Sequence, residues 1–68
     1  MFEFITLTHL DSGDIIYINI GWIQSFGLTS YMGNKVTVVE TENIAYYVKE
    51  SPEHVMDKIS AQNALMRR

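Results

Sequence analysis

Apolar and polar residues alternate along the start of the chain, as they do in a β-strand with two distinct faces. In FEFITLTHL, the odd positions share one face and the even positions share the other. The next run, DIIYINI, is dense in β-branched residues and is apolar on both faces. A DSG turn joins the two runs, and Gly13 can adopt a left-handed conformation there at little cost. This pattern predicts a β-hairpin with strands over about residues 2–10 and 14–20.

Three further strands are predicted in the middle of the chain. GWIQSFGL predicts a short strand over about residues 22–28, and the loop TSYMGNK follows, with its tight turn at Gly33–Asn34. VTVVET and NIAYYVKE predict a hairpin with strands over about residues 35–41 and 44–50. Asn43, in the turn of this hairpin, is a residue that tolerates a positive φ. No helical period competes with the strand pattern in this region.

The pattern changes at Ser51, after which a helix is predicted over about residues 52–65. Serine is a preferred N-cap residue, and Pro52 at the first helical position loses no hydrogen bond and already has a helical φ. Apolar residues then recur in one stripe of about two turns, namely Val55, Met56 and Ile59. The sequence therefore predicts a single α+β domain over residues 1–68, mainly β: a small antiparallel β-meander of about five strands with one C-terminal α-helix.

The predicted strands are apolar on both faces, but a single short helix can cover only one of them. A chain of 68 residues buries only about 60% of the surface of its unfolded state, so chains of this size usually need a disulfide, a metal or oligomerisation for stability. The sequence has no cysteine, and His9 and His54 lack the spacing of a zinc or iron site. A homo-oligomer is therefore predicted, in which another copy covers the second sheet face.

Charge and hydropathy exclude several classes of partner. The formal net charge is −3, with only five lysines and arginines, and nucleic-acid binding depends on neutralising phosphates. We therefore expect no DNA or RNA partner. The N-terminal residues lack the basic and unbroken apolar segments of a signal peptide, and no apolar run is long enough for membrane insertion. A cytoplasmic protein is expected.

No group of residues has the spacing of a catalytic or metal site, and no cofactor is expected. His9 and His54 have no serine or carboxylate at a diagnostic spacing, so the sequence does not predict an enzyme. The two aspartates of DSGD supply too few oxygens for calcium and are typical of a turn. Four glutamates are most simply a solvated acidic rim, which would favour a basic protein surface over an anionic one: Glu40, Glu42, Glu50 and Glu53.

The candidate binding residues are mainly aromatic. Tyr46 and Tyr47 place one ring on each sheet face, which favours one core ring and one interface ring over a ligand-stacking pair. Trp22 suits either the core or an interface hot spot. Tyr31 and Met32 lie at a predicted loop tip, where they either fold back, become buried in a homo-oligomer, or contact a partner. The full candidate set is Tyr17, Asn19, Trp22, Tyr31, Met32, Tyr46 and Tyr47.

Three segments, ITLTHLDSGDIIYIN, WIQSF and VTVVETENIAYYVKESPEHVMDKI, resemble the FlbD-like small proteins of the flagellar and swarming-motility group. The likeness covers most of residues 4–59. Two features depart from that family: the turn ETENIA has no Asn-Gly, and the insert LTSYMGNK is longer and more aromatic. The resemblance implies the predicted architecture, and it is compatible with a phage or mobile-element relative. The matching positions are Leu7, Thr8, Leu10, Gly13, Ile18, Asn19, Trp22, Ile23, Phe26, Val48, Lys49, Glu50, Ser51, Val55 and Ile59.

Three functions from different classes remain open at this point. The leading one is a non-enzymatic, homo-oligomeric β-sheet module that binds a protein partner. The second is a protein that binds or sequesters a small nucleotide-like signal, as phage-encoded sequestering proteins do, in pockets between subunits lined by Tyr17, Asn19, Tyr31, Tyr46 or Tyr47. The third, remote one is an RNA regulator, because the order of strands and helix superficially resembles the CsrA-type translational regulators. Those regulators depend on basic strand edges that this chain lacks.

Overall fold

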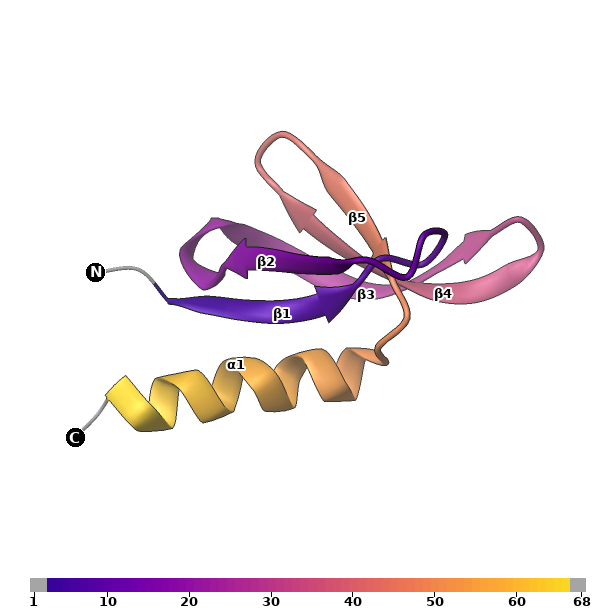
Figure 1. Cartoon of the computed structure of the whole chain (residues 1–68). Helices are drawn as coiled ribbons and strands as arrows, with labels where there is room; N and C mark the ends of the chain where they lie inside the picture. Colours follow the sequence, from indigo (N-terminus) through magenta and orange to yellow (C-terminus); the bar gives the residue numbers. More distant parts are fainter. Residues whose placement is uncertain (1–2, 67–68) are drawn as a thin grey trace.

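The computed structural model describes residues 3–66, with side chains up to residue 62. Its elements are β1 (Phe4–Thr8), β2 (Ile15–Asn19), the 3₁₀ turn η1 (Ile20–Trp22), β3 (Ile23–Tyr31), β4 (Asn34–Thr41), β5 (Ala45–Val48) and α1 (Pro52–Met66) (Figure 1). The predicted class is confirmed: five antiparallel strands precede one C-terminal helix. The first strand was expected to begin at residue 2, which lies outside the described residues.

The strands form two antiparallel sheets, β1–β2 and β3–β4–β5. The two sheets meet where the end of β1 reaches β5. An isolated bridge pairs His9 with Val48, and the backbone N–H of Lys49 donates to the carbonyl of Thr8 at 2.9 Å. The order in space is therefore β2, β1, β5, β4, β3. In the part of the chain that the structure describes, β2 and β3 are the two outermost strands, each paired on one side only.

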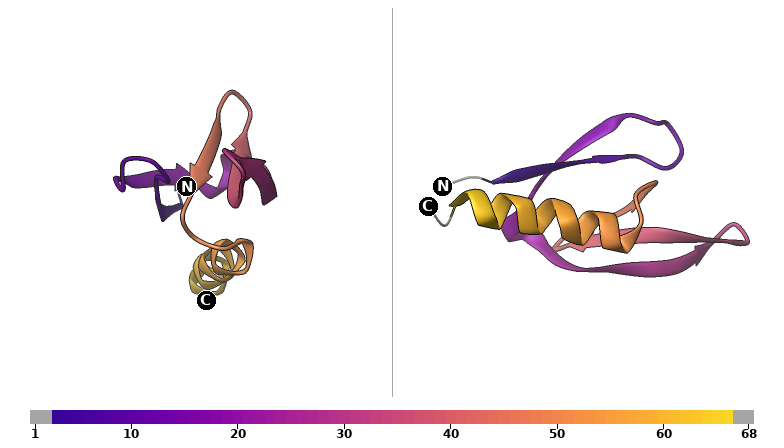
Figure 2. Two further views of the ribbon diagram at one scale, coloured as in Figure 1. Left: turned by 90° about the vertical axis from the view of Figure 1, so that its right-hand side faces the viewer. Right: turned by 90° about the horizontal axis from the view of Figure 1, so that it is seen from below.

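A single core lies between the two sheets and α1. In Figure 2, α1 is seen from below between the β1–β2 hairpin and the β3–β4 hairpin. Ile5 of β1 pairs with Ile18 of β2, and Thr37 of β4 pairs with Val48 of β5. In each strand, these residues and every second residue from them face the core. The fully enclosed apolar residues come from β1, β2, β4, β5 and α1: Ile5, Leu7, Ile18, Val39, Val48 and Val55.

The helix begins where the sequence predicts. The hydroxyl oxygen of Ser51 accepts a hydrogen bond from the backbone N–H of His54 at 3.1 Å, which confirms Ser51 as the N-cap. Val55 is buried as expected, but Met56 is exposed rather than part of the covered stripe. Successive helical residues differ in direction by about 100°, so Met56 cannot share a face with both Val55 and Ile59.

The covered face of α1 includes two polar side chains that the apolar pattern does not reveal. The ammonium group of Lys58 donates to the carbonyl of Thr6 at 2.6 Å, and the amide of Gln62 donates to the carbonyl of Phe4 at 3.1 Å. These carbonyls lie on the edge of β1 that faces away from β2. The helix therefore supplies hydrogen-bond donors to an otherwise open strand edge, as well as apolar cover.

The segment Thr29–Lys35, predicted as the loop TSYMGNK, is mostly strand. β3 continues to Tyr31, which pairs directly with Asn34. Only Met32 and Gly33 remain in the turn, with φ of 53° and 82°. Two successive positive φ values are typical of the tight turns that match strand twist. The turn was thus predicted one residue too late, at Gly33–Asn34, because that dipeptide has the usual turn composition.

Two other local predictions are also corrected. Asn43 has no positive φ. Thr41 closes the β4–β5 turn instead, because its hydroxyl donates to the carbonyl of Ile44 at 2.9 Å and its backbone N–H donates to the same carbonyl at 2.9 Å. The third strand begins at Ile23 rather than at Trp22, which belongs to η1.

The turn η1 separates the two halves of the fold. The side-chain oxygen of Asn19 accepts a hydrogen bond from the backbone N–H of Gly21 at 2.9 Å, which starts the 3₁₀ turn. A Cβ atom at Gly21 would lie only 3.3 Å from that oxygen. The turn sends β3 away from β2, so the chain departs from a simple meander at this point and leaves one edge of each strand open.

Candidate interaction surface

The outer face of the β1–β2 hairpin, turned away from the core, is apolar and uncovered. The register pairs Thr6 with Tyr17 and Thr8 with Ile15 on this face. The exposed fraction is 70% for Tyr17 and 58% for Ile15, and Phe4 is exposed beside them. We call Phe4, Ile15 and Tyr17 the hairpin patch. The described chain thus carries large apolar side chains on a two-stranded sheet that no other element covers.

The hairpin patch adjoins an open backbone edge. The N–H of Ile20 donates to the carbonyl of Glu3 at 2.9 Å, and the N–H of His9 donates to the carbonyl of Asp14 at 2.8 Å. Even-numbered residues of β2 therefore direct their backbone groups toward β1, and its odd-numbered residues direct theirs outward. Within residues 3–66, β1 is the only strand that pairs with β2. The β2 sequence, IIYIN, has no charged residue and no proline to discourage pairing.

The opposite edge, that of β1, is closed by the chain itself. Besides Lys58 and Gln62, Glu50 takes part: its carboxylate accepts from the backbone N–H and the hydroxyl of Thr8, each at 2.9 Å. Partial burial opposes ionisation of Glu50, but the hydrogen bonds from Thr8 and the charge of Lys58 hold its pKa below the ordinary value. The outward backbone groups of β1 are thus occupied by side chains of the same chain, whereas those of β2 face solvent in the described residues.

The second face of the β3–β4–β5 sheet is partly covered by the chain's own aromatic residues. The rings of Tyr31 and Tyr47 stack with centroids 4.6 Å apart and an interplanar angle of 24°. The hydroxyl of Tyr31 donates to the carboxylate of Asp11 in the β1–β2 turn at 3.2 Å. The negative charge of Asp11 raises the pKa of Tyr31, and their hydrogen bond acts in the same direction. The hydroxyl of Tyr31 and the rings of Tyr31 and Tyr47 therefore find their partners within this chain.

The seven candidate residues do not converge on one site. Asn19 is buried and holds η1, so its amide is engaged in the fold. Tyr46 is half-buried on the inner side opposite Val39, and it packs against the core. Met32 is 84% exposed at the tip of the β3–β4 hairpin. Only Tyr17 and Trp22 combine large aromatic area with free access to solvent.

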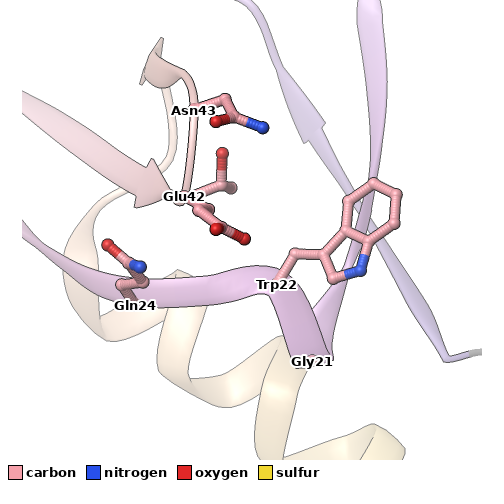
Figure 3. Close-up of a pocket in the computed structure, with 6 residues that line it drawn as sticks. Gly21, Trp22, Gln24, Glu42 and Asn43 are labelled. Carbon is pink, nitrogen blue, oxygen red and sulfur yellow. The ribbon is translucent and has the colours of Figure 1, made fainter.

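Trp22 borders a pocket at the end of the molecule where η1 meets the β4–β5 turn. The pocket has a volume of about 360 Å³, near the lower limit for ligand-sized pockets. In Figure 3, Glu42 and Asn43 project from the β4–β5 turn toward the segment that carries Trp22 and Gln24. Trp22 is 66% exposed, so its indole is open to a partner. The lining residues, here called the Trp22 pocket, are Gly21, Trp22, Gln24, Thr41, Glu42 and Asn43.

A second hollow lies at the other end of β4, beside the start of α1. It has a volume of about 420 Å³ and is lined in part by Leu28, Pro52, Lys35 and Lys49. Leu28 lies on the inner side of β3, opposite Thr37, and its side chain is 62% exposed. The two hollows differ in charge, because this one is lined by Lys35 and Lys49 together with Glu50, whereas Glu42 is the charged residue that lines the Trp22 pocket.

Sequence reasoning identified Trp22 but not the residues that surround it. Glu42 was assigned to a solvated rim, Asn43 was assigned only to the hairpin turn, and Gln24 had no assigned role. Nothing in their spacing links residue 22 to residue 42, because only the antiparallel pairing of β3 with β4 brings Ile23 opposite Thr41. For the hairpin patch a signal did exist, since the two-sided apolar character of DIIYINI identified β2 as a strand with too much apolar surface.

Two further observations concern the part of the chain that the structure describes. None of its groups of histidine, aspartate and glutamate side chains is arranged to hold a metal ion. No helix there has the length and apolar character needed to cross a membrane. Comparisons of the sequence with protein-family models and with curated proteins, and of the structure with solved structures, found no match.

Proposed function

We propose that this protein is a non-enzymatic β-sheet interaction module that forms a homo-oligomer through β2 and binds a protein partner. The observation that carries the proposal is the hairpin patch beside an unpaired, uncharged strand edge. Apolar patches of this kind mark interaction sites, and an exposed edge strand is a template for pairing with another chain. The FlbD-like resemblance is part of the same proposal, as the type of small protein to which this architecture would belong.

The second copy pairs with β2 in an antiparallel orientation centred on Tyr17. The outward backbone groups of Ile15, Tyr17 and Asn19 would then meet those of Asn19, Tyr17 and Ile15 in the other subunit, which makes the contact self-complementary. The pairing joins two short hairpins into a four-stranded sheet. A two-stranded sheet by itself is only marginally stable in water, whereas a sheet of three or more strands with an apolar face can be stable on its own. Both hairpin patches would lie on one continuous surface.

Charge favours the antiparallel orientation over the parallel one. Asp14 flanks β2 at its start. In the antiparallel pair the two Asp14 residues lie at opposite ends, about 20 Å apart at the usual rise per residue. That separation is more than twice the screening length at physiological ionic strength, so their repulsion is small. A parallel pair would place the two carboxylates side by side.

The proposal is tested by measuring the mass of the protein in solution with light scattering after size-exclusion chromatography, from micromolar to hundreds of micromolar. Wild-type protein is expected to show a mass above that of one chain, which increases with concentration. Tyr17→Lys with Ile15→Lys should give a folded monomer, because charges placed on an edge strand oppose pairing.

Leu28→Lys is the matched control, since it also replaces an exposed apolar side chain with lysine, but on β3. This variant should associate as the wild type does. Circular dichroism at the same concentrations verifies that each variant is folded. A wild-type chain that remains monomeric across the whole range would refute the homo-oligomer, and equal dissociation of both variants would refute β2 as its site.

Small-molecule binding is the second candidate, and the observation that favours it is the Trp22 pocket. The aromatic residues first considered for a nucleotide-like ligand are separated in one subunit: Tyr31 and Tyr47 stack on each other, and Tyr46 faces the core. A thermal-shift screen with nucleotides tests this function. A ligand present at 100 times its dissociation constant should stabilise the fold by about 2.7 kcal/mol.

A further inference from the structure

We infer that the Trp22 pocket binds an arginine side chain presented by a protein partner. The inference deepens the proposed interaction function by naming the chemistry of the partner, and it concerns a surface separate from the hairpin patch. It follows from three features of the pocket: an open indole, a carboxylate beside amide acceptors, and a lining that holds no lysine or arginine among the residues that the structure describes.

The indole of Trp22 is the first feature. Among aromatic residues, tryptophan has the ring face that attracts a cation most strongly. Its indole N–H only donates hydrogen bonds, so the acceptors for a cation's N–H groups must come from other residues of the pocket. The side chain is 66% exposed. Exposure of this apolar surface to water is unfavourable, so a partner that covers the ring gains free energy. A planar guanidinium can stack on this ring and cover it in a way that a compact ammonium cannot.

The carboxylate of Glu42 is the second feature. Glu42 lies in the turn between β4 and β5, and it projects toward the side of the pocket that carries Trp22 and Gln24 (Figure 3). The side chains of Gln24 and Asn43 add amide oxygens that can accept hydrogen bonds, whereas the hydroxyl of Thr41 is already hydrogen-bonded to Ile44. A guanidinium carries five N–H donors in a fixed plane, so it can use the carboxylate and neighbouring acceptors together.

The absence of a lining cation is the third feature. No lysine or arginine is among the lining residues of the pocket in the described chain. Lys35 lies near the start of β4, about 20 Å from its end at the usual rise of a strand, and Lys58 is bound to the carbonyl of Thr6. Glu40, near the pocket, is hydrogen-bonded to the hydroxyl of Ser25. Among the described residues, the charged group that lines the pocket is therefore a carboxylate, which attracts a cation and repels a phosphate or carboxylate.

The occupant is expected to come from a protein because a single side chain gains little at an exposed site. Cation–π contacts and surface ion pairs each contribute roughly 0.5–1 kcal/mol there. A free arginine derivative should therefore bind with a dissociation constant of roughly millimolar size, whereas a partner that also contacts neighbouring surface binds more tightly. The pocket would act as a specificity contact within a larger interface.

The test is a titration of the ¹⁵N-labelled protein with acetyl-arginine amide, followed by NMR. Trp22 is the only tryptophan, so its indole N–H gives a single resolved signal at the pocket. Acetyl-citrulline amide is the matched ligand control, because it keeps the planar shape and most N–H donors but has no charge. Acetyl-lysine amide with a free side chain separates stacking of a planar cation from charge alone.

The expected result is a saturable shift of the Trp22 indole and the Asn43 backbone N–H, with arginine bound several-fold more tightly than citrulline and more tightly than lysine. Glu42→Gln should weaken arginine binding about two- to five-fold, the factor that corresponds to a surface ion pair. Glu53→Gln, an exposed glutamate on α1 with the same change of charge, should leave binding unchanged. Trp22→Leu should abolish the shift at Asn43.

Equal shifts with arginine and citrulline would overturn the inference in favour of a neutral planar ligand, and no saturable shift would overturn it outright. Equal effects of Glu42→Gln and Glu53→Gln would reduce it to general attraction by net charge. The titration is repeated on Tyr17→Lys with Ile15→Lys, in which β2 pairing is disrupted. Both proposals predict that this variant loses self-association and keeps arginine binding. A wild type that associates but binds no arginine would refute the arginine inference alone, and a wild type that stays monomeric but binds arginine would refute the homo-oligomer alone.

Discussion

Glu50 accepts two hydrogen bonds from Thr8, one from its backbone N–H and one from its hydroxyl, each 2.9 Å long and spanning 42 residues of sequence. The contact joins the end of β1 to the segment between β5 and α1. It thereby connects the two sheets at the point where the helix begins. Lys58 makes a similar double contact with Thr6, where its ammonium group donates to the carbonyl and to the hydroxyl. Glu50 and Lys58 thus hold two neighbouring outward-facing residues of β1.

Glu50→Gln should lower the free energy of unfolding by about 1 kcal/mol at pH 7, because charge-assisted hydrogen bonds are replaced by weaker neutral ones at a partly exposed site. Urea denaturation followed by circular dichroism measures the change. Glu42→Gln removes the same charge from a turn where no stabilising hydrogen bond depends on it, and it should leave the unfolding midpoint within about 0.5 kcal/mol of wild type.

The contribution of Glu50 should also depend on pH, with a defined sign. Its pKa is lowered in the folded state, so the unfolded chain binds a proton at this group more readily than the folded one. The stabilisation is therefore complete above the ordinary pKa of glutamate, and it is lost as pH falls through the lowered folded value. The difference in stability between wild type and Glu50→Gln should shrink between pH 6 and pH 3. A constant difference across that range would contradict this assignment.

Leu7→Ala should destabilise the fold by about 2–5 kcal/mol, because it leaves a cavity at a side chain that is only 1% exposed. For 68 residues the total free energy of unfolding is roughly 3–10 kcal/mol, so this variant should be near or beyond the limit of folding. Leu28→Ala makes the same chemical change at a side chain that is 62% exposed, and it should cost less than about 1 kcal/mol. Thermal unfolding compares the two directly.

Gly33→Ala should destabilise the β3–β4 hairpin by about 1–2 kcal/mol, because the φ of Gly33 is +82° and a Cβ atom is strained there. Gly27 offers a matched control within the same hairpin. It has no positive φ, and a Cβ atom added there would meet no other atom within 4 Å. Gly27→Ala should therefore be neutral or slightly stabilising by restricting the unfolded chain. Similar losses at both positions would show that strand entropy, not φ, decides the outcome.

The Tyr31–Asp11 contact should be visible in a spectrophotometric titration of the tyrosines. The charge of Asp11 and its hydrogen bond raise the pKa of Tyr31 above the ordinary value of tyrosine, so Tyr31 should ionise at a higher pH than a free tyrosine. Asp11→Asn removes the charge and should lower the pKa of Tyr31 toward the ordinary value, which shifts the absorbance titration to lower pH. Because the folded pKa is raised, any stability from this contact is present below pH 10 and is lost as pH rises through the folded value.

Much of the fold was determined by local sequence. Alternation and β-branched composition located all five strands, although β3 extends three residues past its predicted end. The DSG turn has Gly13 at a positive φ as expected, and Ser51 with Pro52 set the start of α1. These features are fixed by backbone sterics and by hydrogen bonds between residues close in the chain, so a short segment contains all the information needed. Composition likewise identified an excess of apolar surface on β2.

Tertiary structure alone decided which edges and faces stay open. Lys58 and Gln62 look like solvent-facing residues of a helix, but packing of α1 along β1 turns them into donors for its carbonyls. The 3₁₀ turn at Gly21 sends β3 away from β2, and this leaves the β2 edge unpaired in residues 3–66. Pairing of β3 with β4 brings Trp22 close to Glu42. Each outcome depends on contacts between residues far apart in sequence, whose geometry no local pattern of apolar and polar positions contains.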